Sequence, residues 1–411
     1  MRHVMITFEE ARKIVLESVA PLDTIEVPLL DGLGLVAAEN VTSVEKVPPF
    51  DNSAMDGYAV RAEDTKGATE TNPVELEVLL DLPAGGYTDR VIGPGEAVRI
   101  MTGAPVPRGA DTVVQVELTQ KISKNRVRIL EEHPKMKNIR LAGEDIPVGR
   151  TVLAAGEEIG PAKVGLLASV GKTSVKVVRR PRVAILATGD ELLNANEPLA
   201  PGKIRSSNSY TLLCQARTCG AEPIYLGIAR DTIDDVRSHL EKGLSADMIV
   251  SSGGVSVGDY DHVRDALEQL GVKFKFTKVR IKPGKPTVFG LIGRKPVFGL
   301  PGNPVSSMVT FEEFVRPAIL KMMGRRRLFR PVVEAILEEN IDKKPDRMLL
   351  LRAVVRKDGH QYFVSTTGPQ GSGILASMDH ANAIIMFPPG PTPLKKGQRV
   401  NVQLLDMPEV E

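Results

Sequence analysis

The sequence predicts a multidomain chain of the α/β plus β class, in which a mostly parallel sheet forms the central domain. The chain has 411 residues, which is too long for one typical domain. Between residues 183 and 323, apolar strand-like runs alternate with segments of helical periodicity, and this alternation is typical of a parallel sheet covered on both faces. Residues 74–130, and the stretch that follows residue 327, consist of short alternating segments broken by Pro and Gly, so two further β-rich modules are expected.

The composition argues against several classes of partner. Hydrophobic residues make up 42% and charged residues 25% of the chain, which is ordinary for a globular protein. With 53 Lys plus Arg against 51 Asp plus Glu, the formal net charge of +2 creates no general field for nucleic acid or an acidic membrane surface. No apolar run approaches the ~18 residues of a membrane span, and no apolar signal core opens the sequence, so a cytoplasmic protein is expected. The two cysteines, Cys214 and Cys219, lie on one predicted helix and support neither a disulfide framework nor a zinc site.

The N-terminal part of the chain predicts helices joined by extended segments. A helix is expected over residues 7–19, where Thr7 and Glu10 have the spacing of a capping box and apolar residues recur on one face. Extended segments are expected over residues 24–30 and 35–44, on either side of a turn. A second helix is predicted with Pro161 in its first turn and Gly171 beyond its end.

Three polar stretches in this half of the chain are candidates for function. The segment PPFDNSAMDGYAV, residues 48–60, crowds Asp56 and other polar side chains into a turn before a strand. The turn MTGAP contains Thr102, and the segment NIRLAGEDI contains Asp145. Such side chains also satisfy backbone groups or form salt bridges in ordinary loops, so residue chemistry alone leaves both interpretations open.

The central region predicts strands over residues 183–187, 223–227, 248–250, 273–279, 287–291 and 296–300, and helices over residues 207–219, 234–242, 261–270 and 304–323. Ligands of such sheets bind beyond the carboxyl ends of the strands. The polar residues after the strands are therefore expected on one edge of one sheet, and they are Glu191, Asp231, Ser252, Gly253, Gly254, Asp259, Asp261, Lys278, Lys282, Lys285, Pro301 and Pro304. Carboxylates beside a glycine turn and lysines predict a site for an anionic, metal-bridged substrate.

The turn after residue 250 is the centre of this prediction. Its glycines let a ligand approach the backbone, and the amides at the start of the next helix suit a phosphate. Asp259 and Asp261 close the turn, where they either bind a divalent metal or simply cap the helix. In the C-terminal region, a hairpin is expected at residues 357–360, and Ser372 lies in a polar loop that is either a plain linker or a ligand contact.

Seven motifs occur in order along the chain: PPFDNSAMDGYAV, RIMTGAPVPRGAD, NIRLAGEDI, ATGDEL, SSGGVSVGDYD, IKPGKP and FGLPGNPVSS. Together they closely resemble the molybdopterin molybdenumtransferases, the family that includes MoeA and the gephyrin E domain, over nearly the whole chain. The resemblance implies conversion of adenylylated molybdopterin and molybdate to molybdenum cofactor with release of AMP, and use of Mg2+. It also implies a homodimer whose active sites each combine the β-rich arm of one subunit with the later domains of the other. The molybdopterin adenylyltransferase is a candidate partner.

The domain layout implied by the resemblance has four parts. These are an elongated N-terminal domain (residues 1–48 and 144–178), an inserted β-rich domain (49–143), a molybdopterin-adenylyltransferase-like α/β domain (179–327) and a C-terminal β domain (328–411). The family's functional positions fall on Asp56, Thr102, Asp145, Glu191, Asp231, Asp261, Lys278, Lys282, Pro301, Pro304 and Ser372. This chain departs from the family pattern at His262, where relatives often have a tyrosine, which leaves Asp259 open as the acting acid. Residues 192–205 follow no recognisable pattern.

A mechanism follows from these residues. The pterin phosphate is expected on the turn at residues 252–254, with Lys282 and Lys285 offsetting its charge. Glu191 and Asp261 would hold Mg2+ against the phosphoanhydride. Molybdate is a dianion and needs donors rather than acids, so the candidates for its pocket are Lys278, Arg280 and Ser372.

Asp56 and Asp145 are expected to orient an attacking oxygen or an outer layer of ligands.

Two other functions stay open for the chain. The central region also resembles the molybdopterin adenylyltransferases, although the motifs outside residues 179–323 weigh against that activity. A scaffold is the second alternative, because the gephyrin E domain binds receptor peptides on this architecture. The sequence does not distinguish molybdate from tungstate, which have similar size and charge.

Overall fold

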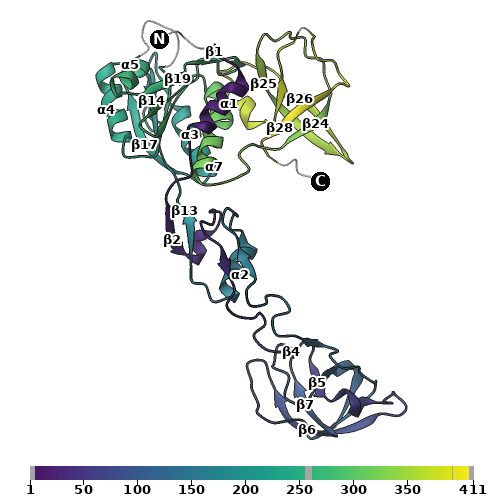
Figure 1. The fold of residues 1–411 in the computed structure, drawn as a ribbon. Coiled ribbons are helices and arrows are strands. Elements are labelled where there is room, and N and C mark those ends of the chain that lie inside the picture. The colour runs from purple at the N-terminus through teal and green to yellow at the C-terminus, as the bar shows by residue number, and fades with distance from the viewer. Residues whose placement is uncertain (1–4, 255–261, 391, 407–411) are drawn as a thin grey trace.

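The computed structural model describes residues 5–254, 262–390 and 392–406. The chain forms an elongated molecule (Figure 1). An α/β domain and a C-terminal β domain lie side by side at one end, a small connecting domain follows, and a six-stranded β domain forms the far end. The multidomain α/β plus β class predicted from the sequence is confirmed.

The far β domain is a single six-stranded sheet in the order β8-β5-β7-β6-β10-β9. Its strands are β5 (Gly57–Val60), β6 (Val74–Leu82), β7 (Glu96–Ile100), β8 (Thr112–Gln115), β9 (Thr119–Ser123) and β10 (Arg126–Ile129), with short helical turns η2 (Ala62–Thr65) and η3 (Val116–Leu118). β-Branched residues such as Val60, Val98 and Ile129 are fully buried on these strands, as the alternating apolar pattern predicted.

The connecting domain is built from paired strands of the two chain segments that pass through it. It contains β2 (Thr24–Pro28) with β13 (Ser174–Val178), β3 (Val41–Thr42) with β12 (Thr151–Leu153), η1 (Leu29–Gly32) and α2 (Pro161–Ser169). The pair β4 (Asn52–Ser53) and β11 (Ile139–Arg140) joins this domain to the far sheet. The predicted extended segment 35–44 contains only the short strand β3, because Val36 and Ala37 form single bridges, to Glu158 and Val177, rather than a continuous ladder.

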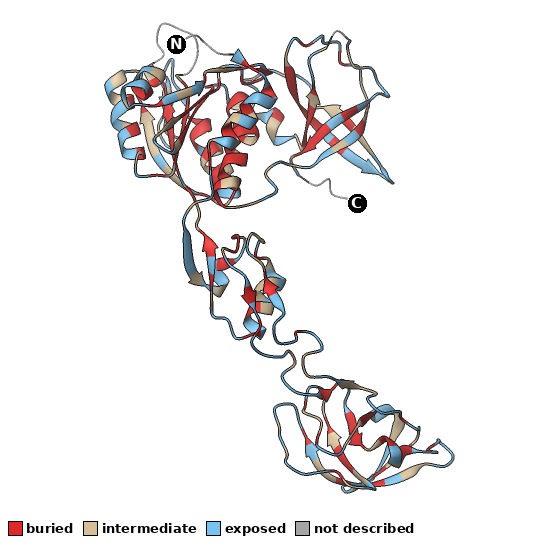
Figure 2. Cartoon of the chain, in the orientation of Figure 1, coloured by how far each residue is buried: buried red, intermediate tan, exposed pale blue. Residues whose placement is uncertain are grey.

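The α/β domain has a six-stranded sheet in the order β17-β14-β18-β23-β22-β19. Its strands are β14 (Arg182–Thr188), β17 (Glu222–Ala229), β18 (Met248–Ser252), β19 (Lys273–Phe276), β22 (Val288–Ile292) and β23 (Lys295–Leu300), and it packs against α3 (Ser207–Thr218), α4 (Ile233–Gly243) and α5 (His262–Gln269). The pairings among β17, β14, β18 and β23 are parallel, and the two at the β22–β19 edge are antiparallel. Strand β18 is buried along its whole length, and β14 and β23 are buried beyond their first residues, which explains their continuous apolar sequences (Figure 2).

The long helix predicted over residues 304–323 is interrupted. It consists of α6 (Pro304–Thr310), a π-helical turn η4 (Phe311–Val315) and α7 (Arg316–Met322). Pro317 has no N–H to donate to the carbonyl of Glu313, so the regular helical ladder fails at this turn.

The first helix, α1 (Phe8–Glu17), packs against this interrupted helix, and the Phe8 and Phe314 ring centroids lie 5.9 Å apart. The predicted capping box of α1 is confirmed. The Glu10 backbone N–H donates to the Thr7 hydroxyl, and the Glu10 carboxylate accepts from the Thr7 N–H. In front of α1, β1 (Met5–Ile6) pairs with β20 (Lys278–Val279).

The C-terminal domain is a closed five-stranded barrel. Its strands are β24 (Val332–Leu337), β25 (Met348–Asp358), β26 (Gln361–Thr366), β27 (Ala383–Phe387) and β28 (Arg399–Leu404), and α8 (Ala376–Asp379) lies before β27. The pairing of β25 with β27 closes the barrel, and the predicted hairpin is confirmed where Asp358 pairs with Gln361. From the α/β domain, β21 (Ile281–Lys282) adds to the edge of β25. None of the helices in the described residues is long and apolar enough to cross a membrane.

Candidate active site

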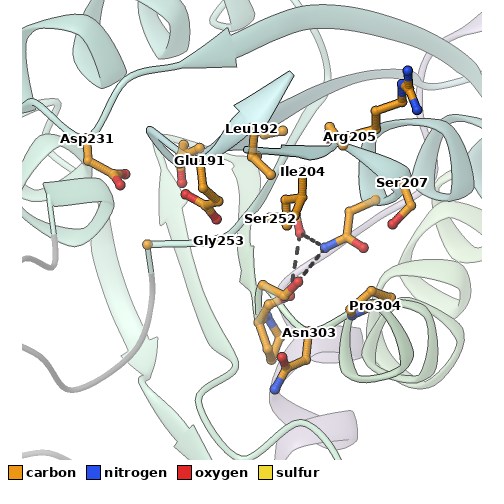
Figure 3. A pocket seen from close by; sticks show the side chains of 18 of the residues that line it. Glu191, Leu192, Ile204, Arg205, Ser207, Asp231, Ser252, Gly253, Asn303 and Pro304 are labelled. Carbon is orange, nitrogen blue, oxygen red and sulfur yellow. Dashed lines mark hydrogen bonds between the residues drawn. The ribbon is translucent and has the colours of Figure 1, made fainter. Parts of the chain in front are cut away.

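A cavity of about 510 Å3 lies beyond the carboxyl ends of β14, β18 and β23 (Figure 3). The sequence prediction that polar residues after these strands meet at one sheet edge is confirmed for part of the predicted set. The residues of that set that line this first cavity are Glu191, Asp231, Ser252, Gly253, Gly254, Pro301 and Pro304. Parallel strands bring these segments together because their carboxyl ends share one edge.

Both positions of the turn after β18 require glycine, because of their backbone conformation and because of the atoms packed against them. Gly253 has φ of 96° and Gly254 has φ of 64°, a region that side chains disfavour. A Cβ on Gly253 would lie 2.5 Å from the Thr188 carbonyl oxygen, and a Cβ on Gly254 would lie 2.4 Å from a methyl group of Val263. The turn therefore leaves its backbone close to the cavity with no side chain in between.

Asn208, near the start of α3, holds the turn against the loop after β23. Its side-chain amide donates to the Ser252 hydroxyl and to the Gly302 carbonyl, each at 2.8 Å, as Figure 3 shows by dashed lines. The donation to a carbonyl fixes which end of the amide carries the nitrogen. Sequence reasoning missed Asn208, and its only sequence signal is its place in the first turn of a helix that follows a parallel strand.

Among the described residues, Glu191 and Asp231 are the carboxylates that line this cavity, and they lie on neighbouring loops that are bonded to each other. The backbone N–H of Asp190 donates to the Asp231 carboxylate and the N–H of Asp231 donates to the Asp190 carboxylate, both at 3.2 Å. These reciprocal bonds fix the loop that carries Glu191, whose side chain lies exposed at the cavity. Within residues 5–254, 262–390 and 392–406, no group of three His, Cys, Asp or Glu side chains is placed to hold a metal. Asp259 and Asp261 lie outside the described residues.

The predicted position of the three lysines on this sheet edge is wrong. The predicted strand 273–279 breaks after β19, so Lys278 lies on β20 and pairs with β1, while Lys282 lies on β21 and pairs with the barrel strand β25. Lys282 and Lys285 line a second cavity of about 370 Å3 between the α/β domain and the barrel. Pro286 lines both cavities, so the two adjoin. Lys278 and Arg280 line neither.

The second cavity is strongly cationic. Its charged lining residues are Lys282, Lys285, Lys343, Arg347 and Arg352, and no carboxylate of the described residues lines it. Ser372, which the sequence predicted as a ligand contact, lines it too, and its hydroxyl accepts from the Asn303 amide at 3.0 Å. Arg347 is partly neutralised by Asp346 outside the lining, at 2.6 Å. Sequence reasoning missed the three cations of the barrel.

Arg352 is the most constrained of these cations. It is 1% exposed, and its guanidinium donates to the Ser377 hydroxyl and the Gly371 carbonyl, each at 3.0 Å, with no carboxylate partner among the described residues. Burial lowers the pKa of Arg352, and burial together with nearby Lys282 and Arg352 lowers the pKa of Lys343. A dianion in the cavity would relieve this repulsion.

A separate polar cluster lies on the far β domain. The backbone N–H and the hydroxyl of Thr102 both donate to one oxygen of Asp56 at 2.7 Å, and these bonds lower the pKa of Asp56. Asp145 is exposed at the join with the connecting domain, where its N–H donates to the Val47 carbonyl at 3.1 Å. Figure 1 places β5 and β4, next to these residues, far from β14. One chain therefore does not bring Asp56, Thr102 and Asp145 to the first cavity.

Comparison with known proteins fits this combination of domains. A molybdopterin molybdenumtransferase of Bacillus subtilis is 38% identical over 383 residues, which cover 92% of this chain and 89% of the relative. Molybdopterin molybdenumtransferase 2 of Mycobacterium tuberculosis is 38% identical over 404 residues, covering 97% and 99%. The chain belongs to the molybdopterin molybdenumtransferase family.

Family models for the regions of these transferases match almost the whole chain. Residues 6–171 match the MoeA N-terminal region (domain I and II), residues 184–321 a probable molybdopterin binding domain, and residues 334–405 the MoeA C-terminal region (domain IV). The crystal structure of the molybdopterin biosynthesis MoeA protein from Pyrococcus horikosii has a TM-score of 0.82 and 34% identity, covering 98% of this chain and 100% of that one.

The function class follows from membership of the molybdopterin molybdenumtransferase family. The chain is an enzyme of molybdenum cofactor biosynthesis. The adenylyltransferase and scaffold alternatives are not favoured, because MoeA regions match residues 6–171 and 334–405 on either side of the probable molybdopterin binding domain.

Proposed function

We propose that this enzyme inserts molybdate into adenylylated molybdopterin, releasing AMP and giving molybdenum cofactor. The observation that carries the proposal is the pair of adjoining cavities that meet at Pro286. One offers a glycine turn and carboxylates, and the other offers five cations and, within the described part of the chain, no acid. The relatives carry the name molybdopterin molybdenumtransferase, which fits one subsite for a pterin and one for an oxyanion.

In this proposal the first cavity takes the adenylylated pterin. Its phosphate rests on the turn formed by Ser252, Gly253 and Gly254, where the two glycines place no side chain between the backbone and the cavity. Pro301 and Pro304 line the cavity on the loop beside this turn, where the Ser252 hydroxyl donates to the Pro301 carbonyl at 3.4 Å. Asn208 keeps the turn in place through its bonds to Ser252 and Gly302.

The second cavity takes molybdate. Lys282, Lys285 and Arg352 face a shared space from two domains, and the hydroxyl of Ser372 adds a donor. The lysines therefore bind the oxyanion rather than the pterin phosphate. Neither Lys278 nor Arg280 lines this cavity, and we assign them no contact with molybdate.

We assign Mg2+ to Glu191 and Asp261. At the first cavity, the exposed carboxylate of Glu191 and the half-buried carboxylate of Asp231 are hard oxygen donors of the type that Mg2+ prefers, so the described residues fit the ion. When bound, Mg2+ offsets negative charge on the phosphoanhydride of the substrate. Asp231 holds the Glu191 loop through its bonds with Asp190.

We further propose a cytoplasmic homodimer with shared active sites. Asp56, Thr102 and Asp145 lie at the far end of the molecule, so the far domain of one subunit would complete the site of its partner. There Asp56, with its lowered pKa, is a charged carboxylate able to orient an attacking oxygen or an outer ligand. The molybdopterin adenylyltransferase, which makes the adenylylated substrate, is a candidate partner.

The central assay incubates the enzyme with adenylylated molybdopterin and molybdate and follows AMP. Release of AMP that depends on molybdate and yields molybdenum cofactor is expected, and release without molybdate would overturn the proposal. Repeating the assay with tungstate tests which oxyanion the second cavity prefers.

The shared site is tested by subunit mixing. Asp56→Ala and Glu191→Ala subunits, each inactive alone, are dissociated, mixed and allowed to pair again. Random pairing puts half of the protein into mixed dimers with one intact site of two, so about a quarter of normal activity should return. Differently tagged subunits that co-purify without any return of activity would show that each site lies within one subunit.

A further inference from the structure

A buried ion pair outside the proposed mechanism lies between the α/β domain and the barrel. Arg12 on α1 binds Glu313 on the π-helical turn, and the side-chain amide of Gln403 on β28 donates to Glu313 at 2.9 Å. Glu313 is fully buried. The Arg12 guanidinium lies between two aromatic rings, 4.1 Å from the centroid of Phe8 and 4.5 Å from that of Phe329. We call Arg12, Glu313 and Gln403 the interdomain pin.

The pin is connected to one wall of the second cavity through the barrel. Gln403 pairs with Ile384 on β27, and Ile384 pairs with Arg352 on β25, so the three residues form one row across the sheet. Residues directly opposite one another share a face. Ile384 packs with the α/β core, whereas its neighbour Ile385 packs inside the barrel, so this row faces the α/β domain. The row leads from the pin to Arg352 in the cavity.

The pin is also connected to the opposite wall. Thr310 lies three residues before Glu313 and fills the space beside Gly284. A Cβ added to Gly284 would lie 2.3 Å from the methyl group of Thr310. Gly284 lies between Lys282 and Lys285, and Ser306 on the same helix lines the cavity as well. One wall is thus connected to Glu313 through the interrupted helix, and the other through the row of residues across β25, β27 and β28.

We propose that the interdomain pin sets the separation between the two walls of the second cavity, so that Arg12, Glu313 and Gln403 are positioning residues for the oxyanion. The inference rests on the proposed binding of molybdate there. A small dianion is held by Lys282 and Arg352 together only when their domains keep a fixed distance. Burial raises the pKa of Glu313 and Arg12 opposes that rise, so loss of either group leaves the other buried without its partner.

The test uses Glu313→Gln, which keeps the shape of the side chain and removes its charge. The KM for molybdate, measured by AMP release, should rise by about tenfold, the equivalent of ~1.4 kcal/mol of lost coupling. The KM for adenylylated molybdopterin and kcat at saturating molybdate should stay within about twofold of the parent enzyme. Gln403→Met is the second variant, since it leaves the ion pair intact. It should raise the KM for molybdate by less than Glu313→Gln does, again with little change in the KM for adenylylated molybdopterin or in kcat.

Glu312→Gln is the matched control. Glu312 is the adjacent residue on the same turn, is nearly as buried and pairs with Arg316 and Arg330. The Glu312→Gln variant should have a lower unfolding temperature than the parent enzyme and an unchanged KM for molybdate. An equal rise in that KM for Glu312→Gln and Glu313→Gln would overturn the inference, and so would an unchanged KM in both pin variants.

A parallel variant, Lys282→Ala, separates this inference from the proposed function. Titration calorimetry with molybdate alone should show weaker binding to Lys282→Ala and to Glu313→Gln. If Lys282→Ala binds molybdate as the parent does, the assignment of the cavity to molybdate fails. If only Glu313→Gln binds as the parent does, the pin is purely structural.

Discussion

Replacing Gly253 with alanine is expected to distort the turn that receives the pterin phosphate. The backbone at Gly253 has φ of 96°, so a side chain there costs about 1.5 kcal/mol of conformational strain. The new Cβ would also lie 2.5 Å from the Thr188 carbonyl oxygen, and relieving that overlap costs about another 1.5 kcal/mol. The total of about 3 kcal/mol corresponds to a fall of roughly 6–12 °C in the unfolding temperature of the α/β domain.

Two control variants separate the two costs. Gly202 has φ of 78° with no atom within 4 Å of an added Cβ, so Gly202→Ala carries only the strain and about half of the loss. Gly302→Ala meets only the Gly253 Cα at 3.6 Å and has no unusual φ, so it should change stability little. Scanning calorimetry of the three variants gives the comparison, and the KM for adenylylated molybdopterin should rise for Gly253→Ala. Equal unfolding temperatures for Gly253→Ala and Gly202→Ala would refute the predicted overlap.

Three further predictions concern other parts of the chain. In Asp247, burial raises the pKa, but bonds of 2.6 and 2.7 Å from Arg179 and a backbone donor outweigh it, so the net pKa is lowered. Asp247→Asn should reduce the free energy of unfolding by about 2 kcal/mol at neutral pH, and the difference from the parent should vanish in denaturation curves as the pH falls through that lowered pKa. Thr7→Ala removes the acceptor of the capping box and should cost about 1 kcal/mol, measured by urea unfolding; no loss would show that packing alone holds α1. Thr102→Val keeps the backbone donor to Asp56 and removes the hydroxyl donor, so NMR titration should find the pKa of Asp56 raised only part of the way to its usual range.

The sequence by itself determined the domain classes and part of the first cavity. Its signals there are local. Continuous apolar runs identified β14 and β18 because strands buried on both faces need apolar side chains throughout. The polar residues that follow such strands, among them Glu191 and Ser252, then had to meet at one edge, since parallel strands all end there.

Only the tertiary structure decided the composition of the second cavity. Strands β20 and β21 have two residues each, too few for any period to show in the sequence, and their partners β1 and β25 lie far away along the chain. Because of that pairing, Lys282 lies beside the barrel strand β25 and not at the predicted sheet edge. It also brought in Arg352, which in sequence reads as one polar residue within an apolar strand. Charged residues that come from separate domains show no regular spacing in the sequence, because the distances between their side chains are set only when the domains fold and pack together.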